Sequence, residues 1–147
     1  MMSLRRHIIA AVLSPLMLTG CGGAPSCDSR AVVDTIKERL VRQLKDVWAG
    51  SASGGILGGL VSDGAYDGLK KAAATDASAK DQLDAVDKMA NSLTIELQDI
   101  RPIAIDEKVK KSVCTAQLKM SGPGGSNSDS INYVAQQGSN GLVAELK

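Results

Sequence analysis

Residues 114–120, Cys-Thr-Ala-Gln-Leu-Lys-Met, alternate apolar and polar side chains, and residues 93–98, Leu-Thr-Ile-Glu-Leu-Gln, do the same. Residues 131–135 and 142–146 repeat the alternation. A period of two is typical of strands that bury one face. We therefore expect four strands, separated by Pro102, by the Gly-Pro-Gly-Gly turn at 122–125 and by the Gly-Ser-Asn-Gly turn at 138–141. Because these connections are short, the strands should form an antiparallel meander.

Helical periodicity precedes the strands. From residue 29 to 48, apolar side chains recur every three or four positions, and Asp28 or Ser29 can cap the start. The apolar positions are Val32, Val33, Ile36, Leu40, Val41, Leu44, Val47 and Trp48. The opposite face, which we interpret as facing solvent, carries Lys37, Glu38, Arg42, Lys45 and Asp46.

A second helical pattern covers residues 67–92, with apolar positions at Leu69, Leu83, Val86 and Met89. The Asp residues at 81, 84 and 87 could suggest a metal site, but Lys80–Asp84 and Asp84–Lys88 are spaced as ion pairs on a helix surface. We therefore expect surface pairing and no metal or other cofactor. Helices followed by strands predict an α+β domain, with N-terminal amphipathic helices packed on a C-terminal four-stranded antiparallel meander.

Segment 50–68 differs in composition, with seven glycines around a small apolar set. An irregular connector is one interpretation, because each Gly costs a helix interior about 1 kcal/mol relative to Ala. The pairs Gly54/Gly58 and Gly55/Gly59 also match the small-xxx-small pattern of closely packed helices. Contact with a membrane interface is the third alternative, since the apolar run is too short to span a bilayer.

The first twenty residues have the layout of an export signal. A basic start with Arg5 and Arg6 precedes an apolar run over residues 8–18, which ends in small residues. The run of 11 residues is shorter than the roughly 20 that a transmembrane helix needs. We expect residues 1–20 to be removed.

Leu18-Thr19-Gly20-Cys21 resembles the lipobox of bacterial lipoproteins. The resemblance covers about the first 21 residues and implies that Cys21 is acylated, as by palmitate, and becomes the first residue of the mature chain. Stable anchoring needs more than one acyl chain, which fits this family. Gly22 stands where the family's inner-membrane proteins carry Asp, so the resemblance implies an outer-membrane anchor, and we expect the periplasmic side.

The mature chain would carry 15 basic and 16 acidic residues and no histidine, because Arg5, Arg6 and His7 lie in the signal. A chain without histidine lacks Ser-His-Asp and Cys-His chemistry and the commonest zinc ligand. It also has no Ser-x-x-Lys or Gly-x-Ser-x-Gly signature, and we expect no catalysis. The balanced charge and the 2% aromatic content argue against binding of nucleic acid or sugars.

Two thiols remain once Cys21 is acylated, and in an oxidising compartment Cys27 and Cys114 can pair only with each other. Closing this loop of 87 residues would remove roughly 4 to 5 kcal/mol of chain entropy from the unfolded state. Residues 21–26 then form the acylated end and a short tether, whose five residues after Cys21 reach at most about 18 Å. The domain, residues 27–147, should therefore sit against the membrane.

Lys108, Lys110 and Lys111 lie in the connection after the first expected strand, near Arg101. These four residues are candidates for contact with anionic lipid headgroups or an acidic partner, although a solvated basic loop is the plainer interpretation. One long helix followed by a four-stranded meander resembles cystatin-like or nuclear-transport-factor-like domains in architecture, without motif residues.

Two functions fit a small, stapled and tethered domain. The first is a non-enzymatic module that binds another envelope protein or an incoming protein, as an inhibitor or excluder. The second is an accessory structural subunit of an envelope assembly such as a secretion or pilus machine, for which the glycines of segment 50–68 are the best support.

Overall fold

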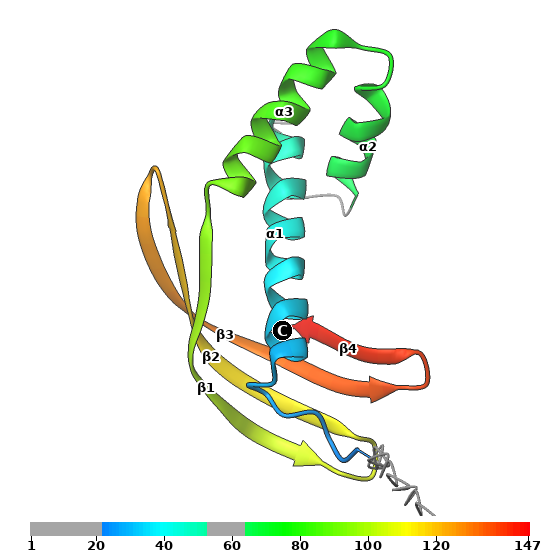
Figure 1. Ribbon diagram of the computed structural model, residues 1–147, viewed down its shortest axis with the longest axis vertical. Helices are drawn as coiled ribbons and strands as arrows, with labels where there is room; N and C mark the ends of the chain where they lie inside the picture. Colours follow the sequence, from blue (N-terminus) through cyan, green and yellow to red (C-terminus); the bar gives the residue numbers. More distant parts are fainter. Residues whose placement is uncertain (1–21, 53–63) are drawn as a thin grey trace, which may run out of the picture.

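The computed structural model describes residues 22–52 and 64–147. Three helices, α1 (Arg30–Ala52), α2 (Ala65–Ala72) and α3 (Ala77–Asn91), come first. Four strands follow, β1 (Thr94–Asp106), β2 (Lys111–Gly122), β3 (Gly125–Gly138) and β4 (Gly141–Leu146). The predicted α+β class is confirmed: α1 lies along the concave side of one curved sheet (Figure 1).

The sheet is an antiparallel meander in the order β1-β2-β3-β4. The alternation in residues 114–120 sets which side chains face inward, because Cys114, Ala116 and Leu118 are buried while Gln117 and Lys119 are exposed. Tyr133 lies opposite Cys114 on β3 and is fully buried. The centre of β2 therefore forms the floor of the core, as its period of two predicts.

Pro102 does not separate two strands, and this prediction was wrong. β1 runs through Pro102, which pairs with Cys114, and continues to Asp106. Pairing of β1 with β2 shifts register between Gln98 and Arg101 and again between Pro102 and Ala104. A proline has no N–H to donate, so edge strands and bulges are where a sheet tolerates it. β1 provides both conditions.

The first half of α1 forms the main core with the sheet. Val32, Ile36 and Leu40 are buried against inward side chains of the strands, including Tyr133 and Ala135. Ser29 begins the helix, since its carbonyl accepts from the N–H of Val33 and its hydroxyl accepts from the N–H of Val32 at 3.4 Å. The helix thus starts where predicted and ends four residues later than the predicted residue 48.

A second core holds α2 and α3 on the second half of α1. Its buried residues are Ala49, Leu69 and Val86, with Trp48, Ala65, Tyr66, Ala79 and Leu83 packed around them. We call α2, α3 and residues 44–52 of α1 the helical head. Figure 1 shows α2 and α3 beside the upper half of α1, beyond β4, so α1 carries the helical contact with the sheet. The expectation that the helices lie on the sheet together is met by α1 alone.

Two predicted core positions are exposed: Val47 on α1 by 38% and Met89 on α3 by 43%. Helical spacing places both residues near the apolar stripe, but no element covers that side of the head among the described residues. Gly50 belongs to α1 and Gly68 to α2. The rest of the glycine-rich segment, residues 53–63, lies outside the described residues, and so do the predicted signal and Cys21.

The predicted disulfide is confirmed. Cys27 and Cys114 are bonded, with their Cα atoms 5.8 Å apart, and both are buried. The bond joins Cys27, three residues before α1, to the centre of β2. The Tyr133 hydroxyl donates a hydrogen bond of 2.8 Å to the Cys27 carbonyl at the same place. No helix within the described ranges is both long and apolar enough to span a membrane.

Removing the disulfide should lower the free energy of unfolding by about 4 kcal/mol, because the unfolded chain regains the entropy of an 87-residue loop. Urea unfolding of the Cys21→Ser chain, with and without the further changes Cys27→Ala and Cys114→Ala, measures the difference. Adding a thiol reductant should reproduce the loss in the first chain and leave the second unchanged. Equal midpoints for the two chains would contradict a stabilising role.

Candidate functional site

The segment before α1, which belongs to the short tether expected over residues 21–26, is hydrogen-bonded to the turn after β1 and to β2. The N–H of Ala24 donates to Glu107 Oε2 at 2.8 Å, and the Ser112 hydroxyl donates to the Pro25 carbonyl at 2.6 Å. Ser112 is buried, so the second bond lies inside the fold. Only Gly22 and Gly23 therefore remain between Cys21 and the part of the chain that the sheet holds.

Three of the four predicted cationic residues gather at one end of the sheet. Lys108 and Lys110 lie in the turn between β1 and β2, and Lys111 is the first residue of β2 rather than part of the connection. Asp106 orders this turn, because its carboxylate accepts from the N–H of Lys108 at 2.9 Å and of Val109 at 3.3 Å. Figure 1 shows the turn beside the segment that precedes α1.

Arg101 does not belong to this group. It pairs with Thr115 on the adjacent strand, whereas Lys111 pairs with Asp106. Five residues of extended strand separate Arg101 from Asp106, a distance of about 16 Å along β1. The nearness of Arg101 to the lysines in sequence is therefore not nearness in space.

Four polar residues of the helical head form a contact that we call the polar junction: Lys45, Asp46, Tyr66 and Asp87. Asp87 Oδ1 accepts hydrogen bonds from Lys45 Nζ at 2.8 Å and from the Tyr66 hydroxyl at 2.7 Å. Asp46 is buried, and its Oδ1 accepts from the Tyr66 N–H at 2.9 Å. The junction thus links all three helices through polar side chains.

The expectation that Lys45 and Asp46 face solvent was wrong. Helical spacing put both on the polar side of α1, but α2 and α3 cover that side near the end of the helix. On α3 the predicted pair Lys80–Asp84 forms at 2.7 Å, whereas the described residues show no Asp84–Lys88 pair. Asp87, the third acidic residue of the series, instead pairs with Lys45 across 42 residues of sequence.

The junction shifts the protonation of both partners. The hydrogen bond from Lys45, followed by that from Tyr66, holds the pKa of Asp87 below its ordinary value. The hydrogen bond to Asp87 raises the pKa of Lys45, and it outweighs the opposing effect of burial. Each charged form therefore stabilises the other in the folded head.

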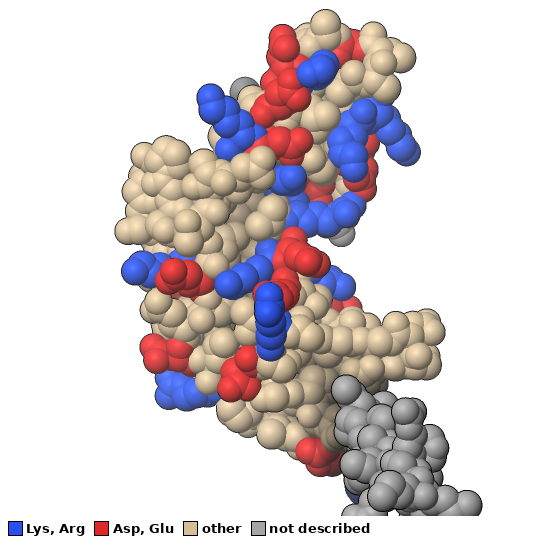
Figure 2. Space-filling view, in the orientation of Figure 1, with Lys and Arg blue, Asp and Glu red and all other residues tan. Residues whose placement is uncertain are grey.

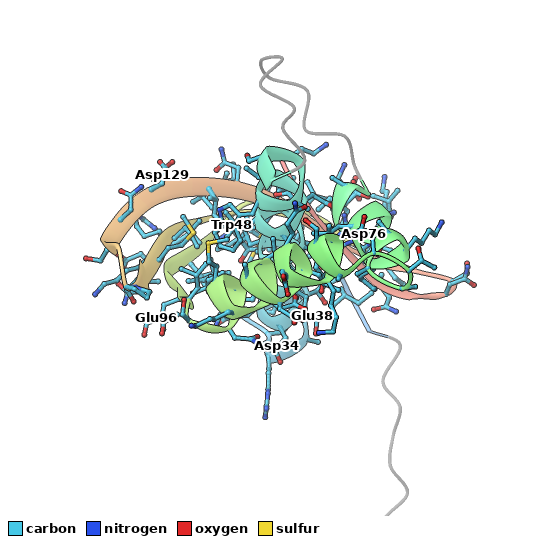
Figure 3. All side chains as sticks on the ribbon, turned by 90° about the horizontal axis from the view of Figure 1, so that it is seen from above. Asp34, Glu38, Trp48, Asp76, Glu96 and Asp129 are labelled. Carbon is cyan, nitrogen blue, oxygen red and sulfur yellow. A yellow bond between two sulfur atoms is a disulfide. The ribbon has the colours of Figure 1, made fainter. Side chains whose placement is uncertain are left out.

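A cleft of about 810 Å³ lies along the exposed sides of α1 and reaches Tyr66 of α2. Its remaining lining residues are Thr35, Lys37, Glu38, Arg39, Val41, Arg42 and Lys45. Figure 2 shows a hollow between the helical head and the β3–β4 hairpin, with charged side chains around it. Figure 3 places Glu38 toward the edge of the molecule and Trp48 near its centre.

Some charges of the cleft are paired and others are not. Arg42 forms an ion pair with Asp67 of α2, and Lys45 belongs to the polar junction. Lys37, Glu38 and Arg39 have no ion-pair partner within the described part of the chain. The cleft therefore offers both signs of charge over an apolar strip that includes Val41.

Within residues 22–52 and 64–147, no group of three or more His, Cys, Asp or Glu side chains is arranged to hold a metal ion. Every buried side-chain nitrogen or oxygen atom of those residues has a hydrogen-bond partner. The sequence could not have indicated the cleft, because its walls come from α1 and from a helix whose position depends on Asp87.

Asp87→Asn should reduce the acid sensitivity of the fold. The pKa of Asp87 lies below its ordinary value of 3.8, so its stabilisation is nearly complete above about pH 5 and is lost as the pH falls through the folded pKa. At pH 7 the variant should lose about 0.5 to 1 kcal/mol, since the pair is partly exposed. Between pH 4 and 2.5, the wild type should lose more stability than the variant.

Urea unfolding followed by circular dichroism at several pH values measures both effects. Asp84→Asn is the matched control, because it removes an exposed ion pair from the same helix and should cost less at pH 7. Parallel pH curves for wild type and Asp87→Asn would show that Asp87 does not hold the head in its ionised form.

Comparison of the chain with protein-family models, with curated proteins and with solved structures gives no match.

Proposed function

We propose that this chain is a lipid-anchored lipoprotein of the bacterial outer membrane, on its periplasmic side, that binds another protein and catalyses no reaction. The lipobox-like Leu18-Thr19-Gly20-Cys21 supports the anchor. The observation that carries the binding role is the open cleft along α1, with its unpaired charges. Inhibition or exclusion of an incoming protein is the form of binding that we favour.

The chemistry of the cleft supports a protein partner. Lys37, Glu38 and Arg39 present charges of both signs from successive positions on a rigid helix. Charges of this kind set the orientation and specificity of a partner, while apolar surface such as that of Val41 supplies contact area. A protein loop or helix with complementary charges could enter a cleft that is open to solvent on one side (Figure 2).

The position of the cleft also suits a tethered binder. The described chain begins beside the turn between β1 and β2, whereas the helical head lies at the opposite end of the molecule (Figure 1). A membrane at the N-terminal end would therefore leave the cleft accessible from the side. The hydrogen bonds of Tyr66 with Asp46 and Asp87 fix α2 against α1 and α3, so the walls of the cleft are held before a partner arrives.

Cross-linking in cells tests this function. A photoreactive amino acid at Glu38 should cross-link one partner protein, and the same residue at Gln117, on the open face of the sheet, should not. The double charge reversal Lys37→Glu and Arg39→Glu should weaken the cross-link by at least about tenfold, because each lost charge contact contributes about 1 kcal/mol or more. Mass spectrometry of the cross-linked bands identifies the partner.

The pattern of partners separates the two candidate functions. A partner captured only when foreign cells or secreted proteins are added supports inhibition or exclusion. A fixed set of envelope subunits, captured without additions and lost with Cys21→Ser, would make the chain an accessory subunit of an assembly. The absence of any cross-link at Glu38 under both conditions would contradict a binding role for the cleft.

A further inference from the structure

Exposed apolar side chains concentrate at the end of β1. Ile103, Ile105 and Val109 are exposed by 59%, 57% and 50%. They make up half of the large hydrophobic residues that are exposed in the described ranges, and they fall within seven consecutive positions. Ile105 lies beside the segment 24–28, and Val109 lies in the turn itself. Exposed apolar side chains this close together in sequence make this end of the sheet a candidate interaction surface.

Two lysines flank the exposed valine. Lys108 and Lys110 are both exposed, and no ion pair is recorded for either one among the described residues. The two carboxylates of the turn are engaged with backbone groups instead: Asp106 with the N–H of Lys108 and Val109, and Glu107 with the N–H of Ala24. The turn therefore presents Val109 between two lysines that form no ion pair among the described residues, and residues 106–111 carry three positive and two negative charges.

The chain leaves the fold at this same place. Ala24 is bonded to Glu107, and only Gly22 and Gly23 lie between Ala24 and Cys21. Three residue steps of extended chain span at most about 11 Å. If Cys21 carries acyl chains, the bilayer surface must lie within that distance of Ala24, and hence close to the turn.

We propose that the turn between β1 and β2 is a second contact with the bilayer, in which Val109 enters the interfacial layer and Lys108 and Lys110 bind anionic lipid headgroups. This inference rests on the proposed lipid anchor. An apolar side chain between two cations suits a membrane interface, where the valine leaves water and the ammonium groups meet phosphates. The turn and the anchor together fix which way the domain faces.

A membrane explains the arrangement better than an acidic protein does. Charge complementarity fits both, but the two-residue distance from Cys21 leaves little room for a protein between the turn and an anchored bilayer. The ordered backbone of the turn also keeps Val109 outward, since Asp106 caps it and Lys110 has a φ of 50°. Val109 is thus already ordered in its exposed position, so that membrane binding costs little conformational entropy of the turn.

An environment-sensitive fluorophore at residue 109 tests the contact. The full lipidated chain with Val109→Cys is labelled and reconstituted in vesicles of phosphatidylethanolamine and phosphatidylglycerol. We expect a blue-shifted emission and quenching by a nitroxide-bearing lipid. The matched control is Ser126→Cys, an exposed position near the turn at the opposite end of the sheet, where the label should keep the emission it has in water.

Charge reversal tests the lysines. Lys108→Glu with Lys110→Glu should remove the part of the blue shift that depends on phosphatidylglycerol. The control pair Lys71→Glu with Lys88→Glu changes net charge equally on the helical head and should leave the signal unchanged. Circular dichroism and urea midpoints confirm that each variant is folded. An equal signal from both pairs would overturn the role of the lysines.

Flotation separates this inference from the proposed anchor. If the wild-type chain fails to float with vesicles in the way that Cys21→Ser fails, the lipid anchor is wrong and the turn has no bilayer to contact. If the wild-type chain floats but the label at 109 keeps the emission it has in water, the anchor stands and the second contact is overturned. Shielding of that label by an acidic protein alone would assign the turn to a protein partner.

Discussion

The bond between Cys27 and Cys114 is the constraint on which the rest of the structure depends. It fixes Cys27, three residues before α1, to β2, and the Tyr133 hydroxyl of β3 donates a hydrogen bond to the Cys27 carbonyl at the same point. The bond sets the course of the chain on both sides of Cys27. The segment 22–26 runs along the sheet, and α1 crosses its concave side. A small domain with one curved sheet and few aromatic residues gains much of its rigidity from such a covalent tie.

The interactions that stabilise the helical head differ from those at the disulfide. Its apolar core is small, with Ala49, Leu69 and Val86 as the buried members, and it receives little help from the sheet. Polar side chains also fix how the three helices pack, because Asp46 and Asp87 accept hydrogen bonds from neighbouring helices. The two halves of the domain thus differ in what stabilises them: the lower half combines apolar burial with a disulfide, and the upper half combines a smaller apolar core with ionised side chains.

Features that depend on residues close in sequence were mostly predicted correctly, and features that depend on distant residues were mostly not. Alternation along β2 predicted which side chains face the core, because a strand's period is a local property, and the counting of cysteines predicted the disulfide. Pro102 misled: the first strand of a meander is an edge strand, where proline is tolerated, but nothing in the sequence indicates the two register shifts of β1. Lys45 and Asp87 were assigned to solvent for a similar reason: their partners lie more than 40 residues away.

For the candidate site too, prediction succeeded for residues that are close in sequence and failed for those brought together by the fold. Lys108, Lys110 and Lys111 meet because they are neighbours in the chain, whereas Arg101 lies five residue steps before the end of the strand. The cleft could not be predicted at all, because Tyr66 of α2 joins the α1 residues that line it only through the packing of the head.

The continuity of α1 gives the molecule a fixed reach. Its 23 residues make a rod of about 34 Å, which begins three residues after the disulfide and ends in the head. A flexible linker of equal length would let a bound protein take many positions. A helix fixed at its base would instead hold that protein at one distance and in one direction. A protein bound at the head would therefore be held at a set distance from the disulfide.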